Sequence, residues 1–185
     1  MNLRILIADD EPIIRMGLKA MLQEMGHSVT AANNGREALR MARNHNFDLA
    51  ILDVKMPFTD GLQAAATLSR ESPLPIILLT AFSERDLVEK ASDLPIQGYL
   101  VKPVQPGQLA AAISVALKRF AESQQERTRS AQLEETLEER KIIERAKGKL
   151  MAGGLSEEEA HRTLQRQARE TRQTMLQIAR LVLGE

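Results

Sequence analysis

Short apolar runs alternate along most of the chain with segments in which apolar residues recur every three or four positions. The helical spacing is clear at Ile14, Leu18 and Met21, between the first two runs. Continuous apolar strands separated by amphipathic helices are typical of a parallel sheet covered on both faces. The pattern predicts an α/β fold, a doubly wound five-stranded parallel sheet, with strands at residues 3–8, 29–31, 49–52, 76–80 and 98–101.

The pattern becomes helical from about residue 106 onward. Residues 122–130 are wholly polar but contain neither Pro nor Gly, which favours a helix that continues outward over a flexible linker. Leu133 and Leu137 lie four positions apart and can pack against a partner helix, although no heptad extends cleanly from Phe120 to Ile143. Over this segment, a coiled coil with a partner helix and a single helix exposed to solvent are therefore both open alternatives.

The C-terminal region has clear helix boundaries. Gly153 and Gly154 are expected to end one helix, and Ser156 with Glu159 has the spacing of a capping box that begins the next. Apolar residues at helical spacing predict a small three-helix domain there. We expect a first domain at residues 1–120, a helical linker at 121–135 and a second domain at 136–185.

The composition limits the class of protein. The 185 residues include no cysteine, which excludes a disulfide framework and cysteine-ligated zinc and indicates a reduced, cytoplasmic protein. No apolar run approaches the roughly 20 residues of a membrane span, so we expect no membrane partner. The net charge is zero, but residues 140–180 hold ten Lys or Arg against five Glu, which makes that segment basic.

Polar and charged residues follow four of the predicted strands. Asp9 and Asp10 end the first, Asp53 the third, Thr80 the fourth and Lys102 the fifth. Each of these residues alone has an ordinary structural explanation, since a lone Asp is commonly a helix cap and a Lys-Pro pair commonly forms a turn. Because parallel strands end at one edge of the sheet, we expect these groups to converge. Crowded carboxylates need a cation, and all-oxygen ligation suits Mg²⁺ beside a phosphoryl group. With Lys102 as an electrostatic clamp, an aspartate can act as the nucleophile.

These segments resemble the receiver domain of bacterial response regulators, which has a flavodoxin-like fold. The resemblance covers about residues 2–120 and rests on four stretches, at residues 3–12, 48–61, 77–81 and 98–103. It implies that Asp53 accepts a phosphoryl group from the phosphohistidine of a cognate sensor histidine kinase, and that the protein is not an enzyme beyond slow self-dephosphorylation.

The resemblance also implies roles for the surrounding residues. Asp9, Asp10, Asp53 and the backbone carbonyl of Lys55 would hold Mg²⁺. Lys102 would pair with the phosphoryl oxygens and precede a cis peptide bond to Pro103. Thr80 would move to bond the phosphate while Tyr99 changes rotamer. These two movements would change the conformation of the face formed by the fourth helix, fifth strand and fifth helix. Phosphorylation would thereby favour a homodimer.

The basic C-terminal segment carries cations at helical spacing. Arg162, Arg166 and Arg169 share one helical face, an arrangement that suits either contact with nucleic acid or a solvated helix surface. No Phe, Tyr or Trp follows Phe120, so an aromatic stacking platform is absent.

Residues of about 133–183 resemble the ANTAR domain, an RNA-binding antiterminator module. The resemblance rests on residues 137–151, 155–161, 164–168 and 178–179, and His161 departs from it because an aromatic residue usually follows Ala160. It implies binding of RNA hairpins by a dimer and transcription antitermination. A DNA-binding transcription factor and a phosphorylation-gated protein adaptor are the alternatives. The candidate RNA contacts are Arg145, Lys147, Gly148, Lys149, His161, Arg162, Arg166 and Arg169.

Overall fold

The computed structural model describes residues 2–81 and 94–184. It divides into two compact units, residues 1–123 and 124–185. Within the described residues, no helix is both long and apolar enough to cross a membrane.

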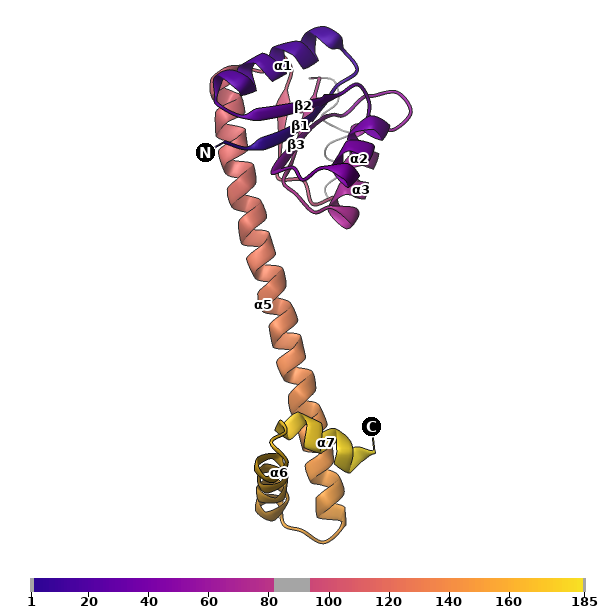
Figure 1. Cartoon of the computed structure of the whole chain (residues 1–185), viewed down its shortest axis with the longest axis vertical. Helices are drawn as coiled ribbons and strands as arrows, with labels where there is room; N and C mark the ends of the chain where they lie inside the picture. Colours follow the sequence, from indigo (N-terminus) through magenta and orange to yellow (C-terminus); the bar gives the residue numbers. More distant parts are fainter. Residues whose placement is uncertain (1, 82–93, 185) are drawn as a thin grey trace. The chain divides into compact units, whose positions relative to one another are not determined.

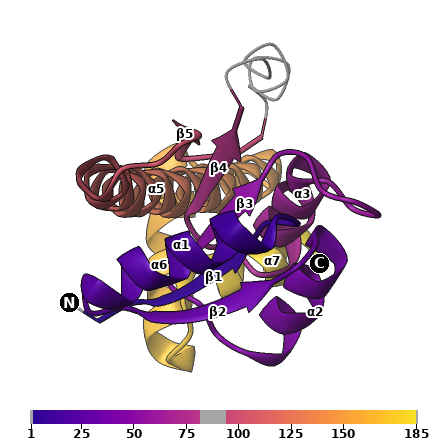
Figure 2. The same cartoon turned by 90° about the horizontal axis from the view of Figure 1, so that it is seen from above.

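The first unit is built on a five-stranded parallel sheet. The strands lie in the order β2-β1-β3-β4-β5, which Figure 2 shows from one edge of the sheet to the other. This is the predicted doubly wound sheet, with each boundary within one residue of its predicted position. The strands are β1 (Arg4–Ala8), β2 (Ser28–Ala32), β3 (Leu49–Asp53), β4 (Ile76–Thr80) and β5 (Gly98–Val101).

Successive strand residues alternate between two cores, because side chains along a strand point to opposite faces. Leu6, Leu52 and Leu78 belong to a core completed by α2 and α3, which lie together on one side of the sheet (Figure 1). Ile7 and Ile51 belong to the other core, completed by α1 and α5. These helices are α1 (Pro12–Glu24), α2 (Gly35–Asn44), α3 (Gly61–Glu71) and α5 (Pro106–Ala152).

Burial differs between the central and the edge strands. Every residue of β3 and of β4 is buried, as the apolar runs predicted. The edge strand β5 is only partly covered, and Tyr99 is 57% exposed. The helix expected between β4 and β5 falls largely on residues 82–93, which lie outside the described residues.

The second unit consists of the C-terminal part of α5 with α6 (Glu157–Thr171) and α7 (Met175–Leu183). Residues 122–130 are helical, as their lack of Pro and Gly predicted. Ser156 caps α6 with the capping box that the sequence predicted, and Thr174 caps α7 in the same way. The small core contains Ala146, Leu164, Ala168, Ile178 and Ala179.

Candidate functional site

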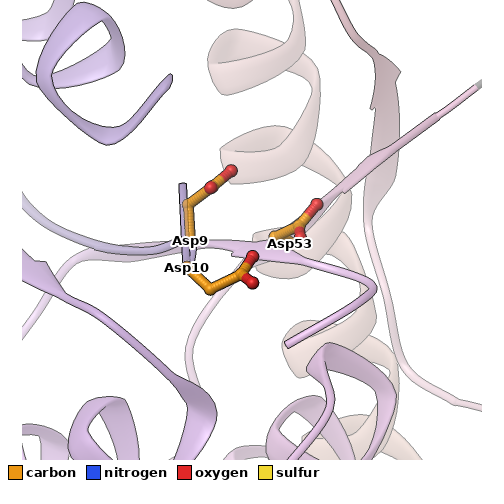
Figure 3. Close-up of side chains that lie close together, drawn as sticks. All are labelled: Asp9, Asp10 and Asp53. Carbon is orange, nitrogen blue, oxygen red and sulfur yellow. The ribbon is translucent and has the colours of Figure 1, made fainter. Parts of the chain in front are cut away.

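Three carboxylates meet at the edge of the sheet where β1 and β3 end. Ala8 of β1 is paired with Leu52 of β3, so the residues that follow them, Asp9 and Asp53, are neighbours. Asp9, Asp10 and Asp53 each offer an oxygen atom, and these atoms lie within 4.8 Å of one another. Figure 3 shows the three side chains together. The structure therefore brings together the acidic residues that the sequence singled out.

Lys102, which follows β5, joins two of these carboxylates. Its Nζ lies 2.7 Å from Oδ1 of Asp53 and 2.8 Å from Oδ2 of Asp9, and its side chain is 15% exposed. Burial lowers the pKa of Lys102, but the adjacent carboxylates of Asp53 and Asp9 together outweigh burial, so the pKa is raised. Lys102 is therefore a charged ammonium that compensates two buried acids.

Asp53 is a buried acid whose charged form is disfavoured by its surroundings. Burial raises its pKa to about 6 against an unperturbed 3.8, because desolvation penalises the carboxylate more strongly than Lys102 stabilises it. The neighbouring charges of Asp9 and Asp10 raise the pKa of Asp53 further. At neutral pH the side chain is a carboxylate that is poorly satisfied by its surroundings, which suits a nucleophile or a ligand for a cation.

The raised pKa makes stability depend on pH with a definite sign. The folded pKa of Asp53, about 6, exceeds the unfolded value, so ionisation of this group lowers stability as the pH rises through about 6. Asp53→Asn, which stays neutral, is expected to raise the free energy of unfolding in metal-free buffer at about pH 7.5. The difference between the folded and unfolded pKa of Asp53 limits this gain in the free energy of unfolding to roughly 3 kcal/mol.

Urea denaturation of both proteins with a chelator present, over a series of pH values, measures this difference. The gain from Asp53→Asn should shrink as the pH falls and vanish near the unfolded pKa, because Asp53 is then neutral in both states. A difference that does not vary with pH would contradict the raised pKa.

The turns around these carboxylates are held by groups that the sequence did not single out. The backbone N–H of Glu11 donates to Oδ1 of Asp9 over 2.8 Å. A guanidinium nitrogen of Arg15, on α1, donates to the backbone carbonyl of Asp9 over 2.6 Å. Glu11 also lies 3.6 Å from Nζ of Lys102. Glu11 could have been found as the third acid after β1, but no sequence signal marks Arg15.

Gly61 places α3 directly against the end of β3. The Gly61 N–H donates to the carbonyl of Val54 over 2.9 Å, and a Cβ at this position would overlap the backbone carbonyl of Asp53. The side chain of Asp60 caps α3 by accepting from the N–H of Gln63. The Asp60 cap marks the start of α3, and only glycine permits so close an approach of its first residue to the strand.

The remaining receiver residues surround this group. The hydroxyl of Thr80 is buried and donates to the carbonyl of Ala81 over 3.0 Å, and Tyr99 lies on the exposed side of β5. The side chain of Lys55 is exposed in the loop after β3. The Lys102–Pro103 bond is cis, as the resemblance predicted.

The donor set fits a hard divalent cation. All three side chains supply carboxylate oxygens, which magnesium prefers. Oδ2 of Asp9 is buried and accepts no hydrogen bond of standard geometry from the described residues, although Nζ of Lys102 lies 2.8 Å away. A buried oxygen with unused lone pairs is what a cation would satisfy.

The second unit carries an arginine row on the outer face of α6. Ala160, Leu164 and Ala168 are buried along one side of this helix. Because residues on a helix advance by about 100°, Arg166 and Arg169 lie on the side opposite this apolar row, and both are exposed.

The other candidate contacts on α6 interact with neighbouring side chains. Arg162 is exposed but pairs with Glu158 over 2.6 Å. The ring of His161 is half-buried, and its Nε2 lies 3.0 Å from the side-chain nitrogen of Gln165.

The candidates on α5 differ in their exposure. Arg145, Gly148 and Lys149 are exposed, and Lys149 donates to the carbonyl of Leu183 over 3.3 Å. Lys147 is buried, and its Nζ lies 3.0 Å from Glu144 and 2.9 Å from Glu157. Lys147 therefore joins α5 to the start of α6 inside the unit, a role that its place in a basic segment did not reveal.

The parallel sheet and the Asp9–Asp53–Lys102 cluster define the first unit as a receiver domain, the phosphoacceptor module of bacterial signalling. The family model of the response regulator receiver domain matches residues 5–114, and that of the ANTAR domain matches residues 131–183. The chain belongs to the response regulators that join these two domains. It is a phosphorylation-regulated response regulator with an RNA-binding role in antitermination.

Individual relatives agree with this assignment. The transcriptional regulatory protein PdtaR of Mycobacterium tuberculosis H37Rv is 46% identical over 182 residues, which span 97% of this chain and 89% of PdtaR. The chemotaxis protein CheY4 of Vibrio cholerae is 30% identical, with a TM-score of 0.59 over 63% of this chain and 99% of CheY4. The receiver domain of histidine kinase PA1611 of Pseudomonas aeruginosa PAO1 is 26% identical, with a TM-score of 0.59 over 64% of this chain and 99% of that domain. Its structure has a magnesium ion coordinated in the active-site cleft.

Proposed function

We propose that phosphorylation of Asp53 by a sensor histidine kinase controls the binding of RNA hairpins by the second unit. The observation that carries this proposal is the Lys102 bridge between Asp9 and Asp53, with Nζ 2.8 and 2.7 Å from their oxygens, in a chain that also has an ANTAR domain. Such a bridge supplies the charge neutralisation that phosphoryl transfer needs.

The transfer itself requires a nucleophile and a leaving group. An oxygen of the Asp53 carboxylate attacks the phosphorus of the kinase phosphohistidine, a P–O bond forms, the P–N bond breaks, and the imidazole leaves with the bonding electron pair. Asp9, Asp10 and the carbonyl of Lys55 would hold Mg²⁺ beside Asp53. When bound, the cation neutralises the oxygens of the transferring group.

The switch follows from the change in charge. An aspartyl phosphate adds negative charge and acceptor oxygens where Lys102 now pairs with the carboxylate of Asp53. Thr80, whose hydroxyl donates to Ala81, would turn toward the phosphate, and Tyr99 would move with it. These rearrangements bias the surface that includes β5 and thereby favour a dimer.

The output surface lies on the second unit. Arg166 and Arg169 are exposed on α6 and make no ion pair within the described residues, so their guanidinium groups are available to phosphates or bases. Leu133 and Leu137, 58% and 54% exposed, lie four residues apart on α5 and offer apolar contact to a second copy. The proposed active form is therefore a phosphorylated dimer that binds two hairpins.

A gel-shift titration tests this function. The full chain with a phosphate mimic and Mg²⁺ is expected to bind hairpin-containing leader RNA about tenfold or more tightly than random RNA of equal length. Asp53→Asn should not respond to the mimic. Arg166→Ala with Arg169→Ala should weaken binding, whereas Arg40→Ala, which removes an exposed arginine of the first unit, should not.

Other results would favour a different output. Displacement of the preferred ligand by duplex DNA would indicate a DNA-binding transcription factor. Unchanged function in the double arginine variant would indicate a protein adaptor. Light scattering on the same samples should show a higher mass with the mimic, and a monomer or a constitutive dimer in both states would contradict phosphorylation-dependent assembly.

A further inference from the structure

The side chain of Arg15 reaches back from α1 to the loop that precedes the helix. Arg15 is the fourth residue of α1, and helical side chains tilt toward the N-terminus of their helix. One of its guanidinium nitrogens donates to the backbone carbonyl of Asp9 over 2.6 Å, and the residue is half-buried. A hydrogen bond from a charged donor at this distance is of the strong kind. Arg15 therefore fixes the direction of the Asp9 carbonyl.

The loop between β1 and α1 is held by side chains other than the usual helix cap. Glu11, the N-cap residue of α1, makes no side-chain hydrogen bond to the first turn. Its backbone N–H donates instead to Oδ1 of Asp9 over 2.8 Å. The carbonyl before Asp10 is thus held by Arg15, and the N–H after Asp10 is held by the Asp9 carboxylate. Both peptide groups that flank Asp10 are fixed in this way.

The carboxylate of Asp10 has no comparable fixation of its own. The residue is exposed, and its side chain makes no hydrogen bond or ion pair with the part of the chain that the structure describes. Asp9 and Asp53, by contrast, are buried and contact Lys102. Figure 3 shows the Asp10 carboxylate turned toward Asp53. The direction of this third acid is therefore set by its backbone, and the backbone is held in part by Arg15.

We propose that Arg15 is a positioning residue for the magnesium site, because it holds the Asp9–Asp10 peptide so that the Asp10 carboxylate faces the cation beside Asp53. This inference rests on the proposed phosphorylation of Asp53 and adds a residue outside the ligand set to it. Removal of a group that orients a metal ligand commonly lowers metal affinity about 10- to 100-fold. Arg15 acts through the backbone of Asp9 and Asp10 and is not itself a ligand.

The charge of Arg15 would act on the cation in the opposite direction. A guanidinium repels a nearby divalent cation, so loss of the charge by itself would strengthen magnesium binding. Loss of the hydrogen bond to the Asp9 carbonyl frees the peptide before Asp10 and weakens magnesium binding. The sign of the change in affinity therefore separates positioning from simple electrostatics.

Arg15→Met removes both the charge and the donor while keeping a long unbranched side chain. Calorimetric titration of the full chain with Mg²⁺, without a phosphoryl donor, is expected to show affinity lowered about tenfold or more. Arg15→Lys, which keeps the charge and offers one donor group, should recover part of this loss. The thermal midpoint of metal-free Arg15→Met should stay within about 5 °C of the unmodified chain, because buried Leu18 and Leu22 still anchor α1.

Phosphorylation by acetyl phosphate gives a second readout. In Arg15→Met, the Mg²⁺ concentration that gives half the maximal rate should rise about tenfold or more. The rate at saturating Mg²⁺ should stay within about threefold, because a bound cation itself holds the Asp10 carboxylate in place. Such a split between affinity and maximal rate is expected of a positioning residue and not of a group that takes part in the transfer.

Lys19→Met is the matched control. Lys19 is exposed on the same helix, four residues after Arg15, so this variant removes one positive charge without removing a donor to Asp9. Because charges at the surface are screened by salt, its Mg²⁺ affinity should stay within about twofold of the unmodified chain.

Several outcomes would overturn the inference. Unchanged or tighter Mg²⁺ binding by Arg15→Met would do so, as would an equal loss in Lys19→Met. A lower maximal rate with an unchanged requirement for Mg²⁺ would assign Arg15 to the transfer step, and a large fall in the metal-free thermal midpoint of both Arg15 variants would make its role structural. If the unmodified chain neither binds Mg²⁺ nor becomes phosphorylated, the proposed function fails, and this result appears before any substitution is made.

Discussion

Asp53→Asn is expected to abolish phosphorylation of the chain by a small-molecule donor such as acetyl phosphate. The amide keeps the volume of the side chain, but its oxygen carries no full negative charge and is a poor nucleophile. The variant should stay folded, because the neutral side chain removes the desolvation penalty that raises the pKa of Asp53 to about 6. Intact-protein mass spectrometry measures the fraction phosphorylated.

Asp48→Asn is the control for this prediction. Asp48 immediately precedes β3, the strand that Asp53 ends, so it lies at the opposite end of that strand. It makes a surface ion pair with Arg4 over 2.9 Å, and this pair lowers its pKa chiefly through the hydrogen bond from the Arg4 side chain. This variant should be phosphorylated normally. Full phosphorylation of Asp53→Asn would assign the phosphoacceptor to another residue.

Gly61→Ala is expected to destabilise the first unit by about 3 kcal/mol or more. A Cβ at Gly61 would overlap the carbonyl oxygen of Asp53, and the nearest atoms it would meet all belong to the backbone, so no flexible side chain can move aside. Either α3 or the end of β3 must shift, so the rate of phosphorylation should fall along with stability. Urea denaturation gives the free energy of unfolding, and acetyl phosphate labelling gives the rate.

Gly17→Ala provides the comparison. The open space around Gly17 in α1 predicts a change within about 1 kcal/mol, in the stabilising direction, because alanine favours a helix. Gly61→Ala meets backbone where Gly17→Ala meets open space, so the comparison reports the effect of crowding at the start of α3. Equal stabilities for them would contradict the close approach of α3 to β3.

Much of the fold was predictable because its signals are local. The apolar runs that became β3 and β4 are buried on both faces, and such strands cannot alternate between polar and apolar residues. The Ser156 capping box depends on residues three positions apart. Local signals of this kind can be recognised in a short stretch of sequence, because they do not depend on how the rest of the chain packs.

The candidate site was predictable to a similar extent. Asp9, Asp53 and Lys102 follow strands of one parallel sheet, so topology alone brings them to one edge. Arg15, which bonds to the carbonyl of Asp9, was not predictable. An arginine on an amphipathic helix has no sequence feature that distinguishes a positioning role from exposure to solvent.

Lys147 shows most clearly what the sequence could not decide. Its place in the stretch that resembles the ANTAR domain made it a candidate RNA contact, and the structure buries it between Glu144 and Glu157. Glu157 is ten residues away on another helix, so the pairing depends on how α5 and α6 pack. Net charge along a segment therefore does not show which of its cations face solvent.

The sequence by itself determined the order of the elements and the kind of chemistry at the strand ends, because periodicity, helix caps and strand-end residues act over a few positions. Only the tertiary structure decided the ionisation of Asp53 at pKa about 6 and the burial of Lys147 between two glutamates. Burial, ion pairing and free space are set by residues distant in the chain, and these three properties determine which groups remain available to a phosphoryl group or to RNA.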